Sequence, residues 1–146
     1  MKVVDLNVLL YAVNADAPQH ARARRWWEAA LNGDEQIGLA WPVVLGFIRL
    51  ATRGGILPRP LTPRQALDTV DDWIGHPLVI TLRPSDGHWK IFRNLLETAG
   101  AAGNLTTDAH LAALTIEYDA TLYSTDLDFS RFSALKFKNP IRTALA

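Results

Sequence analysis

The sequence of 146 residues contains no cysteine, which excludes disulfide bonds, thiolate catalysis, and cysteine-based zinc or iron–sulfur sites. It has no apolar run near the roughly 20 residues that a membrane-spanning helix needs. Neither sign of charge is in excess, because 15 Lys and Arg balance 15 Asp and Glu. The overall charge therefore does not indicate a nucleic-acid-binding protein, although it is compatible with a local basic patch.

Size and composition predict one ordinary domain. The length fits a single domain over residues 1–146, and 49% hydrophobic with 21% charged residues is typical of a soluble globular protein. The N-terminus reaches an acid at Asp5 and lacks the basic and apolar regions of a signal peptide. We therefore expect a cytoplasmic protein that does not contact a membrane.

Short apolar strands alternate with helical segments along the chain. The strands are expected at 3–4, 37–40, 78–82, 121–124 and 135–137. The helices are expected at 6–13, 19–31, 43–52, 62–74, 86–99 and from Thr106 or Thr107, as N-cap, to about 118. This order predicts an α/β fold with a short central sheet of four or five strands, mainly parallel and covered on both faces.

Three acids fall where the chain reaches the carboxyl edge of this sheet. Asp5 follows the first strand, Asp126 follows the strand at 121–124, and Asp108 lies in the first turn of the helix before that strand. If these two strands are neighbours, the carboxylates converge where open α/β sheets bind ligands. Two unit charges 4 Å apart repel by roughly 4 kcal/mol at an effective dielectric near 20. Either some carboxyls are protonated, or Mg²⁺ or Mn²⁺ neutralises them.

Polar neighbours of these acids are candidates for a supporting role. Asn7 is placed to orient a carboxylate or a water, and Ser124, Thr125 and Asp128 surround Asp126. Each acid taken alone also has a structural explanation, because Asp is common in turns and favourable in the first turn of a helix.

The segments that carry these acids resemble PIN-domain ribonucleases. They are the opening Val-Val-Asp5-Leu-Asn7-Val-Leu-Leu-Tyr, the stretch 104–114, and the segment 120–129 with Arg131-Phe132 after it. The size of the chain and the segment 41–52 are most similar to VapC-type toxins of bacterial toxin–antitoxin pairs. The resemblance extends over nearly the whole chain.

This resemblance implies a PIN-like α/β/α sandwich and a Mg²⁺- or Mn²⁺-dependent endoribonuclease that cleaves structured RNA, either transfer or ribosomal. It also implies a homodimer that a VapB-type antitoxin neutralises. By position, Asp5, Asp108 and Asp126 match the metal-binding acids of the family. Asn7 and Asp128 match frequent neighbours of that site.

The sequence departs from the family at one position. The family usually has a further acid, often Glu, in the helix after the second strand, and Gly46 stands about there. A catalytically weak or inactive PIN-fold module that binds RNA or an antitoxin is therefore the alternative. A phosphatase of the haloacid-dehalogenase type would need an acid where Asn7 stands, and a receiver-like domain would need an acidic pair and a late Lys.

Other residues with binding chemistry have two interpretations. Arg49, in the helix expected to border the site, is a candidate RNA contact. His110 lies two residues after Asp108 and therefore points away from it on a helix, so we take it as structural or antitoxin-facing. His20, His76 and His88 show no metal-ligand spacing. The tryptophans could stack bases, but their spacing favours core or interface packing: Trp26, Trp27, Trp41, Trp73 and Trp89.

Overall fold

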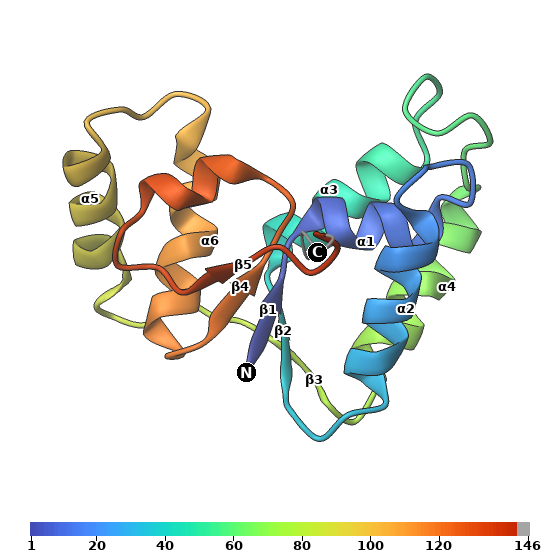
Figure 1. The fold of residues 1–146 in the computed structure, drawn as a ribbon, viewed down its shortest axis with the longest axis horizontal. Helices are drawn as coiled ribbons and strands as arrows, with labels where there is room; N and C mark the ends of the chain where they lie inside the picture. The colour runs from blue at the N-terminus through green and yellow to red at the C-terminus, as the bar shows by residue number, and fades with distance from the viewer. Residues whose placement is uncertain (143–146) are drawn as a thin grey trace.

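The computed structural model describes residues 1–142 as an α/β fold around a five-stranded sheet (Figure 1). The strands are β1 (Lys2–Val4), β2 (Ile37–Leu39), β3 (Val79–Thr81), β4 (Thr121–Tyr123) and β5 (Phe137–Lys138). Their order is β3-β2-β1-β4-β5, and each neighbouring pair is parallel. The predicted α/β class and short parallel sheet are confirmed. The last strand begins two residues later and ends one residue later than expected.

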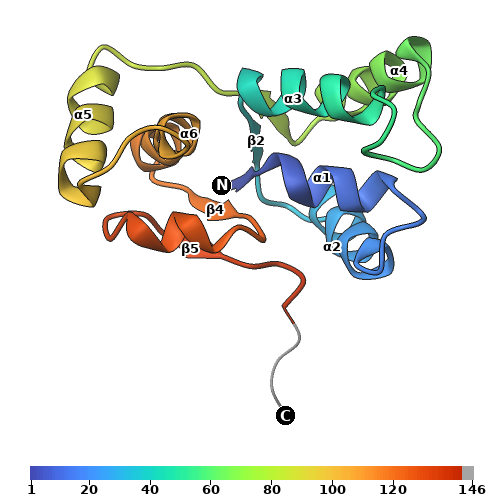
Figure 2. The ribbon, with the colours of Figure 1, turned by 90° about the horizontal axis from the view of Figure 1, so that it is seen from above.

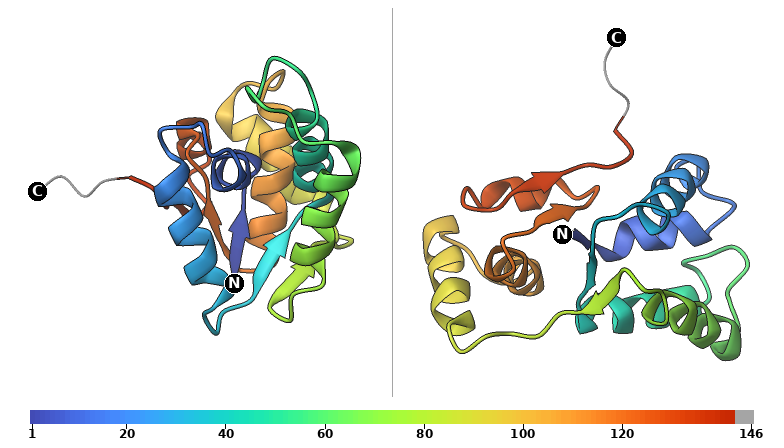
Figure 3. Two further views of the ribbon diagram at one scale, coloured as in Figure 1. Left: turned by 90° about the vertical axis from the view of Figure 1, so that its right-hand side faces the viewer. Right: turned by 90° about the horizontal axis from the view of Figure 1, so that it is seen from below.

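Helices cover both faces of this sheet. They are α1 (Leu6–Val13), α2 (His20–Leu31), α3 (Trp41–Ala51), α4 (Pro63–Ile74), α5 (His88–Ala99), α6 (Leu105–Glu117) and the 3-10 helix η1 (Leu127–Arg131). In the left view of Figure 3, α2 lies on one side of β1, whereas α3, α4 and α6 lie on the other. Within residues 1–142, no helix is long and apolar enough to cross a membrane.

Local sequence explains where several helices begin and end. The Thr62 hydroxyl accepts from the Gln65 backbone N–H at 3.2 Å, and the Gln65 side chain accepts from the Thr62 N–H at 2.9 Å. This capping box opens α4 as predicted. Helix α5 ends at Gly100, whose φ of 70° is in the left-handed region that glycine adopts without strain.

The predicted N-cap of α6 is wrong. The helix does not start at Thr106 or Thr107, because Asn104 occupies the N-cap and Leu105 is the first helical residue. Leu105 is buried, so its apolar side chain anchors the first turn in the core, and this packing outweighs the capping preference of a threonine hydroxyl. Asp108 remains in the first turn, as expected.

The core consists of the strands and the faces of the helices that pack on them. Strand residues Val3, Val4 and Leu122 are fully buried, as expected of short parallel strands covered on both sides. Trp27 and Trp73 are also buried, with ring centroids 5.8 Å apart, which confirms core packing for these two. Trp41 and Trp89 are instead 48% and 66% exposed.

The strand order places the predicted site. Strand β1 pairs with β2 on one side and with β4 on the other, with Val4 opposite Tyr123. The order of the strands reverses here, so the segments that follow β1 and β4 enclose the crevice where open α/β sheets bind ligands. Viewed from above in Figure 2, the ends of α1, α3 and α6 gather around this point.

Candidate active site

Asp5 lies at the base of the site, directly after β1, where it caps α1. One of its carboxylate oxygens, Oδ1, accepts from the Leu6 N–H at 2.7 Å. The other, Oδ2, accepts from the Ser124 hydroxyl at 2.7 Å. Since Ser124 follows β4, this hydrogen bond joins the two central strands at their carboxyl ends.

The Ser124 hydroxyl is the centre of a small hydrogen-bond network. It is fully buried, and besides donating to Asp5 it accepts from Asn7 Nδ2 at 3.4 Å and from the Asp126 N–H at 3.0 Å. Asn7 Oδ1 in turn accepts from the Thr125 N–H at 3.3 Å. A hydroxyl has one donor and two acceptor positions, so Ser124 is fully used. The network fixes Asp5 relative to the segment that carries Asp126.

Three carboxylates form a group above this network. Asp108 from α6, Asp126 after β4 and Asp128 in η1 each offer an oxygen, and these oxygens lie within 4.8 Å of one another. Asp126 Oδ1 also accepts from the Asp128 N–H at 2.9 Å, which keeps the two side chains on the same short turn. We call Asp108, Asp126 and Asp128 the acid group.

The crowding of the acids shifts their pKa values. Burial, together with repulsion from Asp126, Asp5 and Asp128, raises the pKa of Asp108 to about 6. Burial also raises the pKa of Asp5, partly offset by its hydrogen bonds to Ser124 and Leu6, while Asp126 raises it further. Among residues 1–142, no basic side chain offsets these effects on either carboxyl. The cluster is therefore one that a positive ion would stabilise.

The donor set fits a hard divalent cation. Carboxylate oxygens are the ligands that Mg²⁺ and Mn²⁺ prefer, and Mg²⁺ is usually held by only one or two carboxylates with several waters. Asp108, Asp126 and Asp128 have their oxygens close enough to share one ion. Asp5 is outside this set of three, and both of its oxygens already accept hydrogen bonds.

Comparison with known proteins decides the family. The family described as "PIN domain" matches residues 2–135. The chain belongs to the PIN-domain family, in its VapC group. It is 44% identical over 142 residues to "Ribonuclease VapC33" of Mycobacterium tuberculosis. The aligned residues cover 97% of this chain and 99% of that protein. It is 43% identical over 140 residues to "Ribonuclease VapC37" of the same organism, over 96% of this chain and 97% of that one.

Solved structures of toxin–antitoxin proteins share the PIN fold. VapBC2 from Rickettsia felis, bound to a DNA fragment from its promoter, aligns over 94% of this chain and 97% of its own, with a TM-score of 0.67 and 19% identity. Mycobacterium tuberculosis VapC20, described as a toxin that cleaves the sarcin-ricin loop, aligns over 89% of this chain and 93% of its own, with a TM-score of 0.66 and 18% identity.

Gly46 lies where α3 packs closely on α1. A Cβ at Gly46 would lie 2.8 Å from Cδ2 of Leu6, because α1 packs closely on α3 there. Any side chain at this position therefore requires Leu6 to move. The site is left with acids from β1, α6 and the segment after β4, and none from α3.

Arg49 takes no part in the hydrogen bonds of Ser124 or in the acid group. It is exposed in the last turn of α3 and makes no hydrogen bond or ion pair with residues 1–142. Its guanidinium is thus accessible to a ligand, and its role in RNA binding stays a prediction.

Two features of the site were underestimated from the sequence. Ser124 joins three site residues, a role that only the pairing of β1 with β4 creates. Asp128 lies in the acid group itself, and the Asp-x-Asp spacing with Asp126, typical of a tight turn, was the signal for it. The hydrogen bonds that join Glu117, His88 and His110 lie outside the acid group, and ligand spacing gave no signal for them.

Proposed function

We propose that this chain is a Mg²⁺-dependent endoribonuclease toxin, also active with Mn²⁺, that hydrolyses phosphodiester bonds of structured RNA. The observation that carries the proposal is the acid group: three carboxylates within 4.8 Å, with Asp5 fixed beside them. Burial and repulsion from the neighbouring aspartates raise the pKa of Asp108, and a bound cation would relieve this repulsion. We regard residues 1–146 as one PIN domain that acts in the cytoplasm.

Each acidic side chain has a part in this proposal. Asp108, Asp126 and Asp128 hold the cation, and Asp5 adds negative charge at the base of the site. When bound, the ion supplies activation of the attacking water and stabilisation of charge on the phosphoryl oxygens. Asn7 accepts from the Thr125 N–H and donates to Ser124, which donates to Asp5. This network keeps the carboxylates in place, so little reorganisation is needed when substrate arrives.

Partners follow from the family and from the surface. Arg49 is the proposed phosphate contact, because an exposed guanidinium with no partner among residues 1–142 is free to contact phosphate. The RNA would be a transfer or ribosomal RNA, supported by the sarcin-ricin-loop description of VapC20. A VapB-type antitoxin would neutralise the chain, supported by the VapBC complex among the structural neighbours, and we expect a homodimer.

A second function is favoured by one observation. Gly46 packs against Leu6 where the family usually has an acid, so the site has one carboxylate fewer on α3. A module of weak or no catalytic activity that binds RNA or an antitoxin is compatible with this arrangement.

Cleavage of a panel of transfer and ribosomal RNA fragments distinguishes the two functions. We expect specific cleavage with Mg²⁺ or Mn²⁺ and none with EDTA. Asp5→Asn and Asp108→Asn should both abolish cleavage in folded protein, whereas Asp34→Asn, an exposed carboxylate without a partner among residues 1–142, should not. Undiminished cleavage by pure Asp108→Asn protein would refute the nuclease. RNA binding without metal-dependent cleavage would favour the binding module.

A further inference from the structure

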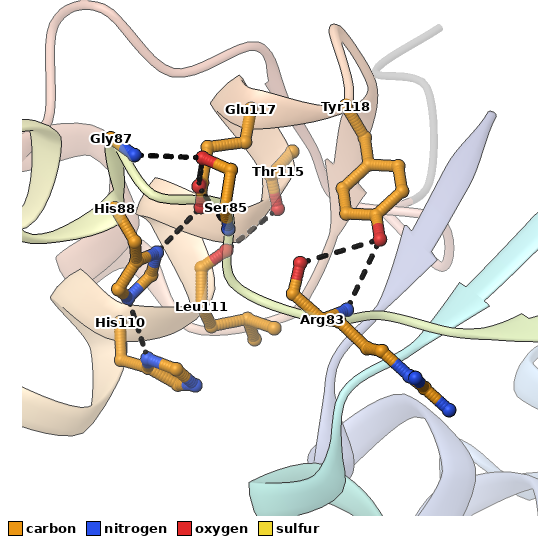
Figure 4. Close-up of polar contacts among 9 residues, drawn as sticks. All are labelled: Arg83, Ser85, Gly87, His88, His110, Leu111, Thr115, Glu117 and Tyr118. Atoms are coloured by element: carbon orange, nitrogen blue, oxygen red, sulfur yellow. Dashed lines mark hydrogen bonds and ion pairs between the residues drawn. The ribbon is translucent and has the colours of Figure 1, made fainter.

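A chain of hydrogen bonds runs along the face of α6 that is turned toward α5 (Figure 4). Glu117 Oε2 lies 2.5 Å from His88 Nδ1, and His88 Nε2 lies 2.9 Å from His110 Nδ1. His110 and Glu117 are seven residues apart, which is two helical turns, so both face the same way. None of these side chains belongs to the acid group.

Glu117 is ionised and accepts the hydrogen bond at one end of this series of hydrogen bonds. Its carboxylate accepts from the Ser85 N–H at 2.9 Å and from the Ser85 hydroxyl as well as from His88. Burial raises the pKa of Glu117, but the hydrogen bonds from Ser85 and His88 outweigh it and lower the pKa overall. The carboxylate therefore requires a proton on His88 Nδ1. This orients both imidazole rings and leaves Nε2 of His110 with no partner among residues 1–142.

This series of hydrogen bonds ends at His110, which lines a pocket between α5 and α6. The cavity has a volume of about 450 Å³ and is lined by Pro42, His88, Trp89, Phe92, Thr106, Thr107 and His110. The rings of Trp89 and Phe92 lie 5.6 Å apart at an angle of 32°, and the Trp89 side chain is 66% exposed. The pocket thus combines exposed aromatic faces with the hydroxyls and imidazole of α6.

The pocket and the acid group share the first turn of α6. Thr106 and Thr107 line the pocket, and the next residue, Asp108, belongs to the acid group. Thr106 and His110 lie two residues before and after Asp108, so the pocket and the acid group are on different sides of this turn. A helix with its side chains is about 10–12 Å wide, so a stretch of a few nucleotides that passes over the N-terminal end of α6 would reach both.

We propose that this pocket binds an unpaired nucleobase of the RNA, a few nucleotides from the phosphate that is cleaved, stacked on Trp89 and read at its edge by His110. The inference rests on the proposed nuclease function and adds a requirement for an unpaired base. Every base has a flat face that stacks on an aromatic ring, and the polar edge distinguishes one base from another.

The same features favour a nucleobase over a second copy of this chain. An interface between copies needs apolar contact, but the residues that line this pocket include Thr106, Thr107 and His110, whose side chains carry hydrogen-bonding groups. Buried in an apolar contact, these groups would lose hydrogen bonds to water. A base supplies both the flat apolar face and the hydrogen-bonding edge.

Binding of short RNA in the absence of metal tests the proposal. We would measure fluorescence anisotropy of labelled rA6, rC6 and rU6 and of an abasic hexamer, all in EDTA. Trp89→Ala should weaken binding of the base-containing hexamers by about 5- to 150-fold, the range for loss of one stacked base. Trp89→Phe should retain most of the affinity, and Leu67→Ala, an exposed apolar residue on α4, should change nothing. The abasic hexamer should bind all variants equally weakly.

His110→Ala tests the reading of the base edge. The wild type should prefer one of the three hexamers, and His110→Ala should reduce that preference while stacking on Trp89 persists. Unchanged binding by Trp89→Ala would overturn the proposal, and an unchanged preference in His110→Ala would overturn the role of the histidine.

Two further outcomes separate this inference from its alternatives. If Trp89→Ala shifts the sedimentation of the chain to a smaller species while hexamer binding is unchanged, the face binds a second copy and the proposal is overturned. Binding is measured in EDTA and therefore separately from metal-dependent cleavage. A chain that cleaves RNA but shows no Trp89-dependent binding would overturn this inference alone. Trp89-dependent binding by a chain that cleaves no RNA would instead contradict the nuclease, and with it the position of the base near a cleaved phosphate.

Discussion

Replacing Asp108 with Asn should stabilise the chain without metal and remove its stabilisation by metal. In the metal-free protein, Asp108 is a carboxylate held near Asp126, Asp5 and Asp128, and burial with this repulsion raises its pKa to about 6 from 3.8. The asparagine amide has nearly the same shape and no charge. It therefore removes the repulsion but also removes a ligand for the ion.

The pKa sets the size and the pH range of this effect. Below about pH 4 Asp108 is protonated in both states, and its full contribution to stability is present. As the pH rises through about 6 that contribution is lost, because the unfolded chain ionises more readily. Without screening by water, the shift in pKa from 3.8 to about 6 corresponds to a loss of about 3 kcal/mol in the free energy of unfolding. Asp108 is only half-buried, so screening by water leaves about 1.5 kcal/mol.

Thermal unfolding in EDTA at pH 8 and at pH 4 measures the effect. Asp108→Asn should raise Tm by about 3–6 °C at pH 8 and leave it nearly unchanged at pH 4, while Asp34→Asn should do neither. Mg²⁺ at about 100 times its Kd should stabilise the wild type by about 2.7 kcal/mol and the variant far less. An Asp108→Asn protein that is no more stable than the wild type at pH 8 would refute the crowding of the acids.

Two other substitutions test the support of the site and the helix ends. Ser124→Ala should destabilise the chain by about 1–3 kcal/mol in urea unfolding, because Asp5 and the Asp126 N–H each lose a buried partner. A cost near zero would show that water replaces the hydroxyl. Gly100→Ala should cost about 1 kcal/mol because φ there is 70°. Gly87→Ala, at φ −84° with only Ser85 Oγ at 3.8 Å, should cost clearly less, and equal costs would remove the backbone explanation.

Much of the site could be predicted from the sequence because its parts are local. Asp5 and Asp126 follow apolar strands directly, and Asp108 lies in the first turn of a helix, so strand and helix patterns suffice to place all three at one edge. The capping box of Thr62 and Gln65 was predictable for the same reason. Where a non-local contact decides, the prediction failed: burial of Leu105 moved the start of α6 away from the threonines.

The order of residues along the chain thus determined the fold class, the alternation of strands and helices, and which acids reach the edge of the sheet. Only the tertiary structure decided that β1 lies against β4, that Ser124 ties Asp5 to Asp126, and that Asp128 completes the acid group. It alone brought His88 from α5 to His110 on α6. Propensity and periodicity act over a few residues, whereas these contacts join segments that meet only when the sheet closes and the helices pack on it.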